Sequence, residues 1–340
     1  MTRSQRPSTS GRHQPSEPVQ AFKSSDVLVF VEDAAATAAC LSHAVKVAGA
    51  YGGKVILVQV LCKPLDNNSP VDPVEWDIRK QQTLKRLGVQ SDRSDDVKNP
   101  CSVQLLEGQC INQITAFMDV RQGDIAASVR PHDALGWLSS ETARGVLLSR
   151  SAGVLMIPSG AAIGPDSNYR RVFVPLDGST RAEAALPVAV TLARAENAHL
   201  VICYVLPVPG LTEFGTQDSE SERLHAIVRR RNEQAGKTYL ARIRKNLEHN
   251  GLPISVRISS GNDVRRELID IMSKENADFV VMATHGQSGH KDVPTGDVAR
   301  FILDKSAIPV LLVRTRNSSG QNHAFGSISS KGVRQPAGTD

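Results

Sequence analysis

The chain has 340 residues, of which 40% are hydrophobic, and its formal net charge at pH 7 is +5. This length predicts two domains, and the hydrophobic fraction excludes a largely disordered protein. The longest apolar runs fall far short of the roughly 20 residues that a membrane span needs, so we expect a cytoplasmic protein without a membrane partner.

The basic residues are spread along the chain, apart from Arg229, Arg230 and Arg231 in a polar helical stretch. Such a run can contact nucleic acid, but a solvated helix face explains it more simply, so we do not expect a nucleic-acid partner. The five cysteines include no CxxC pair, which predicts neither a disulfide framework nor a zinc site. Cys40 and Cys203 lie in apolar runs and are expected in the core.

In chain order, composition divides the sequence into five segments. Residues 1–24 are polar and contain proline, which predicts a disordered N-terminal arm. Two apolar stretches at 25–158 and 169–315 predict domains, and the small residues of 159–168 predict a linker between them. Residues 316–340 are again rich in Ser, Gly, Asn and Gln and predict a disordered tail.

The two apolar stretches repeat each other. The first opens with DVLVFVED from Asp26 and the second with RVFVPLDG from Arg171, and SVQLLEG from Ser102 matches SVRISSG from Ser255. Each copy predicts the order β-α-β-α-β-α-β-α-β, so the fold class is α/β, with two tandem doubly wound parallel-sheet (Rossmann-like) domains. Ligands of such sheets bind at the carboxyl ends of the strands, here after the first and fourth strands of a copy.

A long polar segment follows the second strand of the first copy. VDPVEWDIRKQQTLKRL from Val71 predicts an amphipathic helix whose apolar face carries Val74, Ile78 and Leu84. Trp76 in this helix is expected to pack against the core or the partner domain.

The first copy has no glycine cluster after its fourth strand. Pro131 stands there, and Ser140 and Glu141 occupy the positions of the last loop glycine and the aspartate of the second copy, while Glu32 or Asp33 keeps the acidic turn after strand one. Proline removes a donor, and an acid at the phosphate position repels it. We expect no nucleotide binding by this copy.

The second copy does carry a glycine loop. ATHGQSGHKDVPTGDVARF from Ala283 places Gly286, Gly289 and Gly296 in a polar loop before a helix that starts near Asp297. Glycine allows close backbone approach or a positive φ, and a helix N-terminus offers free N–H donors. The combination is compatible with a phosphate cradle, and the alternative is that the glycines only turn the chain.

On these residues the sequence resembles the universal stress protein (UspA-like) family, whose fold is adenine nucleotide α-hydrolase-like. ATP-binding members carry Gly-x2-Gly-x9-Gly followed by Ser or Thr after strand four, and this sequence has Ala283-x2-Gly286-x9-Gly296-Asp297. The resemblance implies an adenine-nucleotide site, with ATP and accompanying Mg²⁺ as candidate cofactors in the second domain only. The residues it implies are Asp177, Val205, Ala283, His285, Gly286, Gly289, Gly296 and Asp297.

The sequence departs from the family pattern at two positions. Ala283 replaces a glycine, and Asp297 replaces the hydroxyl residue that would donate to a phosphate. A carboxylate about 4 Å from a phosphate costs on the order of 4 kcal/mol at an effective dielectric of about 20. Lys291, His290 or a bridging Mg²⁺ could offset this repulsion, and the alternative is that Asp297 serves only as a helix N-cap.

No catalytic residue is assigned. His285 is expected to pack in the loop or line the ligand, and Ser179 is expected to cap the helix that starts near Arg181. Three functions stay open: a stress-response regulator that binds nucleotide in the second domain, a non-binding scaffold that acts through protein contacts, and a nucleotidyl-transfer or ATP-hydrolysing enzyme. We expect that the protein is not an enzyme.

The last strands of the two copies predict association. The apolar runs Val154–Ile157 and Val310–Val313 are expected to pair within the chain as a pseudo-dimer. A homodimer is a further prediction, with the exposed edge of the final strand as its expected contact.

Overall fold

The computed structural model describes residues 24–32, 34–62, 72–92, 101–131, 136–161, 167–207, 219–261, 263–286 and 295–314. The first half consists of β1 (Val27–Phe30), α1 (Ala34–Tyr51), β2 (Val55–Leu61), α2 (Pro73–Asp92), β3 (Ser102–Glu107), α3 (Cys110–Asp119), β4 (Ile125–Arg130), the 3-10 helix η1 (Gly136–Ser139), α4 (Glu141–Leu148) and β5 (Gly153–Pro158). The second half consists of β6 (Arg171–Leu176), α5 (Thr180–Glu183), α6 (Ala185–Glu196), β7 (His199–Pro207), α7 (Ser219–Leu247), the 3-10 helix η2 (Glu248–Asn250), β8 (Ile254–Gly261), α8 (Val264–Lys274), β9 (Phe279–Ala283), α9 (Asp297–Lys305) and β10 (Val310–Val313). The predicted alternation of strands and helices is confirmed in both halves.

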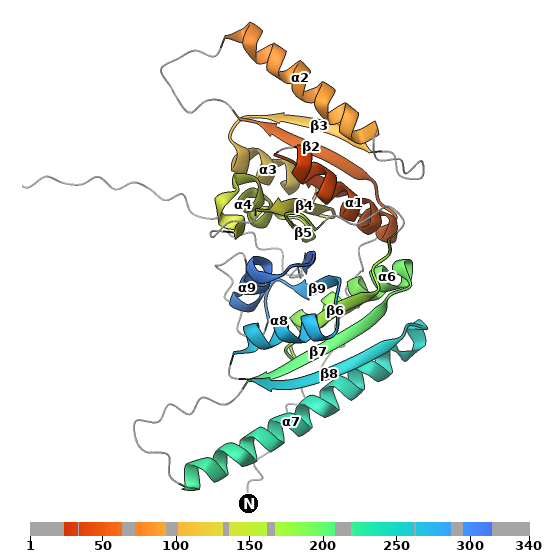
Figure 1. Cartoon of the computed structure of the whole chain (residues 1–340), viewed down its shortest axis with the longest axis vertical. Coiled ribbons are helices and arrows are strands. Elements are labelled where there is room, and N and C mark those ends of the chain that lie inside the picture. The colour runs from red at the N-terminus through yellow and green to blue at the C-terminus, as the bar shows by residue number, and fades with distance from the viewer. Residues whose placement is uncertain are drawn as a thin grey trace, which may run out of the picture.

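The described strands form one ten-stranded sheet in the order β3-β2-β1-β4-β5-β10-β9-β6-β7-β8 (Figure 1). Neighbouring strands within each half are parallel, as expected for doubly wound units. The halves join where β10 pairs antiparallel with β5, with Val310 opposite Met156 and Val313 opposite Gly153. The predicted pairing of the two last strands within the chain is therefore confirmed.

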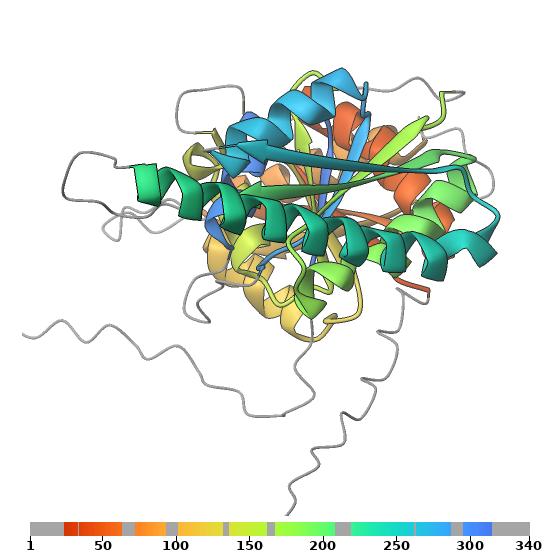
Figure 2. The same ribbon diagram turned by 90° about the horizontal axis from the view of Figure 1, so that it is seen from below.

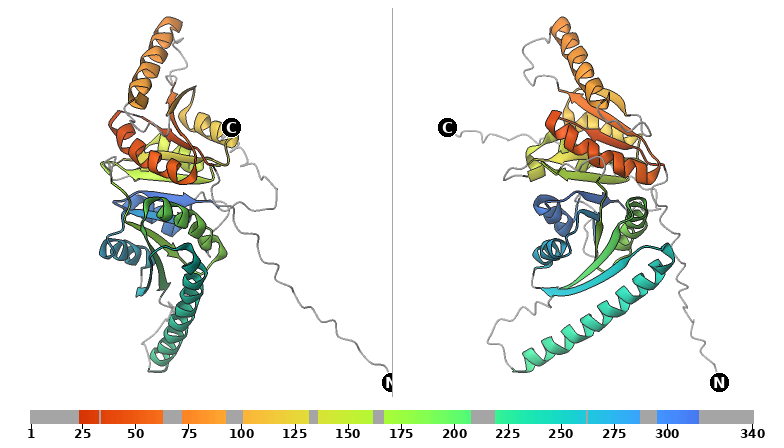
Figure 3. Two further views of the ribbon diagram at one scale, coloured as in Figure 1. Left: turned by 90° about the vertical axis from the view of Figure 1, so that its right-hand side faces the viewer. Right: turned by 45° about the vertical axis from the view of Figure 1, so that its right-hand side comes forward.

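Helices cover both faces of this sheet, with the two halves stacked one above the other (Figure 3). Side chains of β1 alternate between two buried clusters, so that Val27 and Val29 contribute to one and Leu28 and Phe30 to the other. The first cluster includes residues of α1 and α6, and the second includes residues of α3, α4, α8 and α9. Strands buried on both faces must be continuously apolar, which explains the uninterrupted hydrophobic runs in the sequence.

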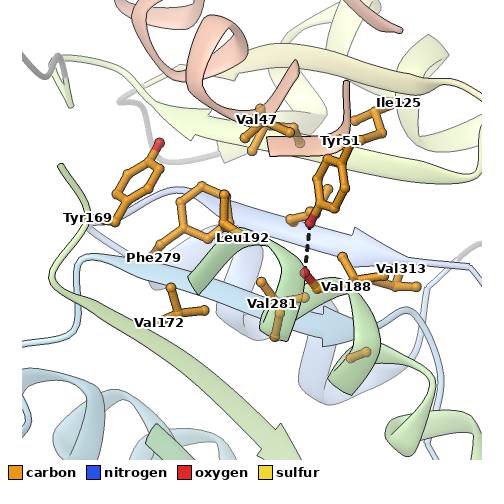
Figure 4. Close-up of a cluster of buried hydrophobic side chains, with 14 of the residues drawn as sticks. Val47, Tyr51, Ile125, Tyr169, Val172, Val188, Leu192, Phe279, Val281 and Val313 are labelled. Atoms are coloured by element: carbon orange, nitrogen blue, oxygen red, sulfur yellow. Dashed lines mark hydrogen bonds between the residues drawn. The ribbon is translucent and has the colours of Figure 1, made fainter. Parts of the chain in front are cut away.

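The first of these clusters continues from one half into the other (Figure 4). Helix α1 contacts α6, and the hydroxyl of Tyr51 donates to the carbonyl of Val188 at 2.9 Å. The ring of Tyr169 packs against Phe279 with a centroid separation of 4.6 Å. The two halves therefore share a hydrophobic core.

Two arginines fasten each half to the last helix of the other. Arg130, at the end of β4, donates to the carbonyls of Asp304 and Ser306 at the C-terminal end of α9. Arg314, directly after β10, donates to the carbonyls of Leu147 and Ser149 at the end of α4. The last carbonyls of a helix have no partner within it, so these guanidinium groups satisfy them. Burial lowers the pKa of Arg314 to about 10.

A buried histidine also links the halves. His43 on α1 has its Nδ1 atom 2.6 Å from the hydroxyl of Tyr169, and its Nε2 atom contacts the carbonyl of Ala161. The His43 and Tyr169 rings are stacked with centroids 5.9 Å apart. The carbonyl can only accept, so Nε2 donates to it, and in the neutral imidazole Nδ1 then accepts from the Tyr169 hydroxyl. Burial, as the largest cause, lowers its pKa below the ordinary value.

Helix α2 forms where predicted, but the predicted apolar face is wrong. Val74 is 67% exposed and Ile78 is 50% exposed, and Leu84 is exposed as well. The side chains that face inward are Trp76, Thr83 and Leu87. The indole Nε1 of Trp76 donates to Glu107 on β3 at 2.8 Å, which confirms that Trp76 packs on its own domain's sheet.

The expected exposed edge of the final strand is also wrong. Strand β10 is paired on both sides, with β9 and with β5, so the outermost described strands are β3 and β8. Helices α2 and α7 lie at opposite ends of the molecule beyond these strands, and α7 crosses the whole of its end (Figures 1 and 2). A homodimer stays a prediction, but not through the last strand.

The predicted arm and tail lie outside the described residues, except for Ser24 of the arm, and residues 162–166 of the predicted linker do as well. The domain boundaries therefore stay predictions. Within the described part of the chain, no helix is long and apolar enough to cross a membrane. Cys40 and Cys203 are buried, as predicted.

Candidate functional site

The second half has its topological switch point between β6 and β9. These strands are neighbours, and from them the chain continues outward in opposite directions, through β7 and β8 on one side and β10 on the other. Asp177 follows β6, and Thr284, His285 and Gly286 follow β9, so these residues lie together at the carboxyl edge. This is the place where open α/β sheets bind ligands.

Gly286 packs directly against Asp177. A Cβ atom at position 286 would lie 2.0 Å from Oδ2 of Asp177, so no other residue fits without movement of the carboxylate or the loop. Gly286 and Gly296 are not among the described glycines with positive φ. Of the two reasons for glycine in this loop, close backbone approach and a positive φ, the structure supports close approach for Gly286.

The turn after β6 is held by the other oxygen of the same carboxylate. Oδ1 of Asp177 accepts hydrogen bonds from the backbone N–H of Ser179 at 3.0 Å and from its hydroxyl at 2.6 Å. The Ser179 hydroxyl in turn accepts from the N–H of Ala182. Ser179 is therefore the N-cap of α5, as predicted, although the helix begins at Thr180.

Helix α9 begins at the same edge. Its N-cap is Gly296, whose N–H donates to the carbonyl of Thr284 at 2.8 Å and so fixes the helix start beside the end of β9. Among the described residues, no side chain caps this helix. The alternative assignment of Asp297 as the N-cap is wrong, because Asp297 is the first helical residue.

Asp297 forms an ion pair that the sequence did not predict. Its Oδ2 lies 3.0 Å from Nη1 of Arg265, near the start of α8, while its side chain remains 79% exposed. The same guanidinium is 3.0 Å from Asp263 through Nε and lies over the ring of Phe301. Hydrogen bonding from Arg265, as the largest cause, lowers the pKa of Asp263. The negative charge that would oppose a phosphate at α9 is therefore partly neutralised.

The remaining implied residues that the structure describes lie in different environments. Ala283 ends β9 and is buried, and Val205 on β7 is buried in the same cluster as Met282. His285 is half-buried, with Nδ1 3.2 Å from the hydroxyl of Thr284. Gly289 lies outside the described residues, as do His290 and Lys291. The described loop ends thus bring Asp177, Gly286 and Gly296 together.

The first half fills the equivalent position with its own carboxylate. Oε1 of Glu32, after β1, accepts from the hydroxyl of Ser140 at 2.6 Å and from the N–H of Thr142 at 3.4 Å. The Ser140 hydroxyl accepts from the N–H of Ala143 and caps α4. An anion that approached this helix N-terminus would have to displace Glu32.

Comparisons with known proteins show which family the second half resembles. The sequence model of the universal stress protein family matches residues 168–314. Universal stress protein MJ0531 of Methanocaldococcus jannaschii is 28% identical over 149 residues, which cover 43% of this chain and 82% of that protein. Universal stress protein YxiE of Bacillus subtilis is 26% identical over 148 residues, covering 43% of this chain and 99% of the relative.

Structural similarity extends over both halves. A universal stress protein from Archaeoglobus fulgidus superposes with a TM-score of 0.60 at 15% identity, covering 86% of this chain and 97% of that structure. At this identity the match shows a common fold alone, and it includes the first half, which the family sequence model does not reach. Residues 168–314 therefore match the universal stress protein family, and the fold of both halves is that of a universal stress protein.

Proposed function

We propose that residues 168–314 bind an adenine nucleotide, ATP in the first instance, and that the chain is a stress-response regulator whose surface depends on that occupancy. The observation that carries the proposal is the packing of Gly286 on Asp177 at the switch point. Because glycine has no side chain, the loop after β9 contacts the Asp177 carboxylate in the loop after β6 directly, and the two loops form one edge of the site.

The phosphates would bind at the N-terminus of α9. Gly296 places that terminus beside the end of β9, and among the described residues no side chain occupies its cap. Free N–H groups and the helix dipole favour an anion there. The open helix N-terminus supports a phosphate group at this position, although the exposed carboxylate of Asp297 opposes it, and we propose that Asp177 faces the nucleoside.

Arg265 supports the proposal in spite of Asp297. Because its guanidinium pairs with Asp297 at 3.0 Å, a phosphate at α9 would meet a paired carboxylate and an exchangeable cation rather than a lone negative charge. Arg265 can then turn from Asp297 to the phosphate. A bridging Mg²⁺ on Asp297 is the competing arrangement, and it requires the same ion pair to open.

Nucleotide binding is proposed for the second half only. In the first half Glu32 already accepts from Ser140 and Thr142 at the start of α4, which is the equivalent of the phosphate position. The alternative function, a scaffold without nucleotide, is favoured by one observation: Asp297 and Arg265 already satisfy each other. We further propose that ATP is bound without turnover.

Calorimetric titration of the full chain with ATP, with and without Mg²⁺, tests the proposal. We expect saturable binding of one nucleotide per chain. Gly286→Ala should weaken it at least tenfold, because the added methyl group must displace the Asp177 carboxylate. Gly88→Ala is the matched control, since a Cβ at position 88 meets nothing within 4 Å. Absence of binding by the folded wild type favours the scaffold. Hydrolysis of labelled ATP that disappears in Gly286→Ala would contradict the absence of turnover.

A further inference from the structure

Three potential metal ligands meet at the carboxyl edge of the first half, away from the proposed nucleotide site. Cys62 follows β2, Cys110 is the first residue of α3 and Glu141 is the first residue of α4. One ligand atom of each, the two Sγ atoms and a carboxylate oxygen, lies within 4.8 Å of the other two. The sequence predicted no metal site because these residues lie far apart along the chain and form no CxxC pair.

The spacing suits one tetrahedral ion. With Zn–S bonds of about 2.3 Å, ligand atoms of a tetrahedral site are about 3.8 Å apart. Cys62 and Glu141 are exposed and can adjust their side chains, while Cys110 is buried and fixes one corner. Three protein ligands leave the fourth position to solvent, which the exposure of Cys62 and Glu141 permits.

The surrounding charge also favours a cation. Glu32 accepts hydrogen bonds from Ser140 and from the N–H of Thr142, the two residues that flank Glu141, so two carboxylates lie at the start of α4. Arg144 pairs with Glu141 at 3.6 Å, so one positive charge is already present on the solvent side. A divalent ion would offset two of the four negative charges that the ligands Cys62, Cys110 and Glu141 and the nearby Glu32 carry when ionised.

The second half carries a positive charge at the corresponding place. There the starts of α8 and α9 are bridged by Arg265, which pairs with Asp263 and Asp297. In the first half, the starts of α3 and α4 carry Cys110 and Glu141 instead. Among the described residues, no arginine side chain bridges these two. We propose that the first half binds a thiophilic divalent cation such as Zn²⁺ through Cys62, Cys110 and Glu141.

A redox pair is the competing use of two neighbouring cysteines. Oxidation by a disulfide such as oxidised glutathione would join Cys62 to Cys110, releasing both thiol protons and passing two electrons to the glutathione disulfide. Reactive cysteines are characteristically found in electropositive surroundings, where the thiolate is stabilised. Here the Glu141 carboxylate lies within 4.8 Å of both thiols and supplies the third ligand that a metal ion uses and a disulfide does not.

The test is titration of the reduced full chain with Zn²⁺ and with Co²⁺ under anaerobic conditions. We expect one ion per chain, and thiolate-to-Co²⁺ charge-transfer absorption that reports sulfur ligation. Cys62→Ser, Cys110→Ser and Glu141→Gln should each weaken Zn²⁺ binding at least tenfold. Cys101→Ser is the matched control, because Cys101 is a free cysteine outside the cluster, and it should bind as the wild type does.

Because Cys62 and Glu141 are exposed, their variants should fold, which melting curves verify. Three results would overturn the proposal. The first is Zn²⁺ affinity unchanged in both Cys62→Ser and Glu141→Gln. The second is Co²⁺ binding without the charge-transfer absorption. The third is a chain that forms the Cys62–Cys110 disulfide with oxidised glutathione, shown by mass spectrometry, yet binds no Zn²⁺ when reduced.

Discussion

Replacing Asp297 with serine should tighten ATP binding, and the structure sets the size of the effect. The Asp297 side chain is 79% exposed, so its repulsion of a phosphate acts largely through water. Two unit charges about 4 Å apart interact by about 1 kcal/mol in water, against about 4 kcal/mol at an effective dielectric of about 20. The lower figure applies, and it corresponds to about fivefold in affinity.

Two variants separate the effect of the Asp297 charge on ATP binding from the effect of the missing hydroxyl donor. Asp297→Ala removes the negative charge and its ion pair with Arg265 without adding a donor, and should bind ATP about fivefold more tightly than the wild type. Asp297→Ser adds a hydroxyl donor, and a hydrogen bond to an anion contributes about 1.5 kcal/mol, so it should gain about a further tenfold. The increase for Asp297→Ala should shrink at high salt, since exposed charges are screened.

Calorimetry at low and high ionic strength measures both effects. Asp270→Ser is the matched control, because Asp270 is an exposed acid on α8 and its loss changes the net charge equally. If neither Asp297 variant binds more tightly than the control, Asp297 does not face the phosphates, and the placement of the ligand at α9 is refuted.

Three further predictions follow from the described contacts. Gly286→Ala should weaken ATP binding at least tenfold while Gly88→Ala binds as the wild type does, and equal affinities in calorimetry would remove Gly286 from the site. Arg314→Met should lower the free energy of unfolding by about 3 kcal/mol or more, because buried carbonyls of α4 lose a charged donor, and urea denaturation showing a loss under about 1 kcal/mol would contradict this role. His43 has a lowered pKa in the folded state, so the unfolded chain binds its proton first as the pH falls, and stability should decrease from pH 7.5 to 5.5 by at most about 1.4 kcal/mol per pH unit for this group. His199, whose pKa is also lowered by burial, adds to this dependence of stability on pH. If His43 contributes, the stability of His43→Gln should change less per pH unit than that of the wild type.

The sequence predicted the fold because its signals were local and repeated. Continuously apolar strands such as Phe279–Ala283 are buried on both faces, and two matching copies imposed the same strand order twice. The apolar runs of the last strands also predicted their pairing. The apolar face of α2 was wrong because its buried stripe is short and includes Thr83, so hydrophobicity alone selected the exposed residues Val74 and Ile78.

The site was predictable only in part. Family-like spacing identified Gly286 and Gly296, and the structure brings Gly286 against Asp177 from a distant strand end. Nothing in the sequence connects Arg265 with Asp297, because their contact depends on how α8 packs beside α9. The same holds for Cys62, Cys110 and Glu141, which the sheet order alone brings together.

The most direct test of nucleotide recognition by residues 168–314 is the thermal and calorimetric response of the purified full chain to ATP. We predict one saturable site per chain and stabilisation that grows with ligand concentration, reaching about 2.7 kcal/mol when ATP is at about 100 times its dissociation constant. A folded chain whose melting temperature and heat signal do not respond to ATP, with or without Mg²⁺, would contradict the account.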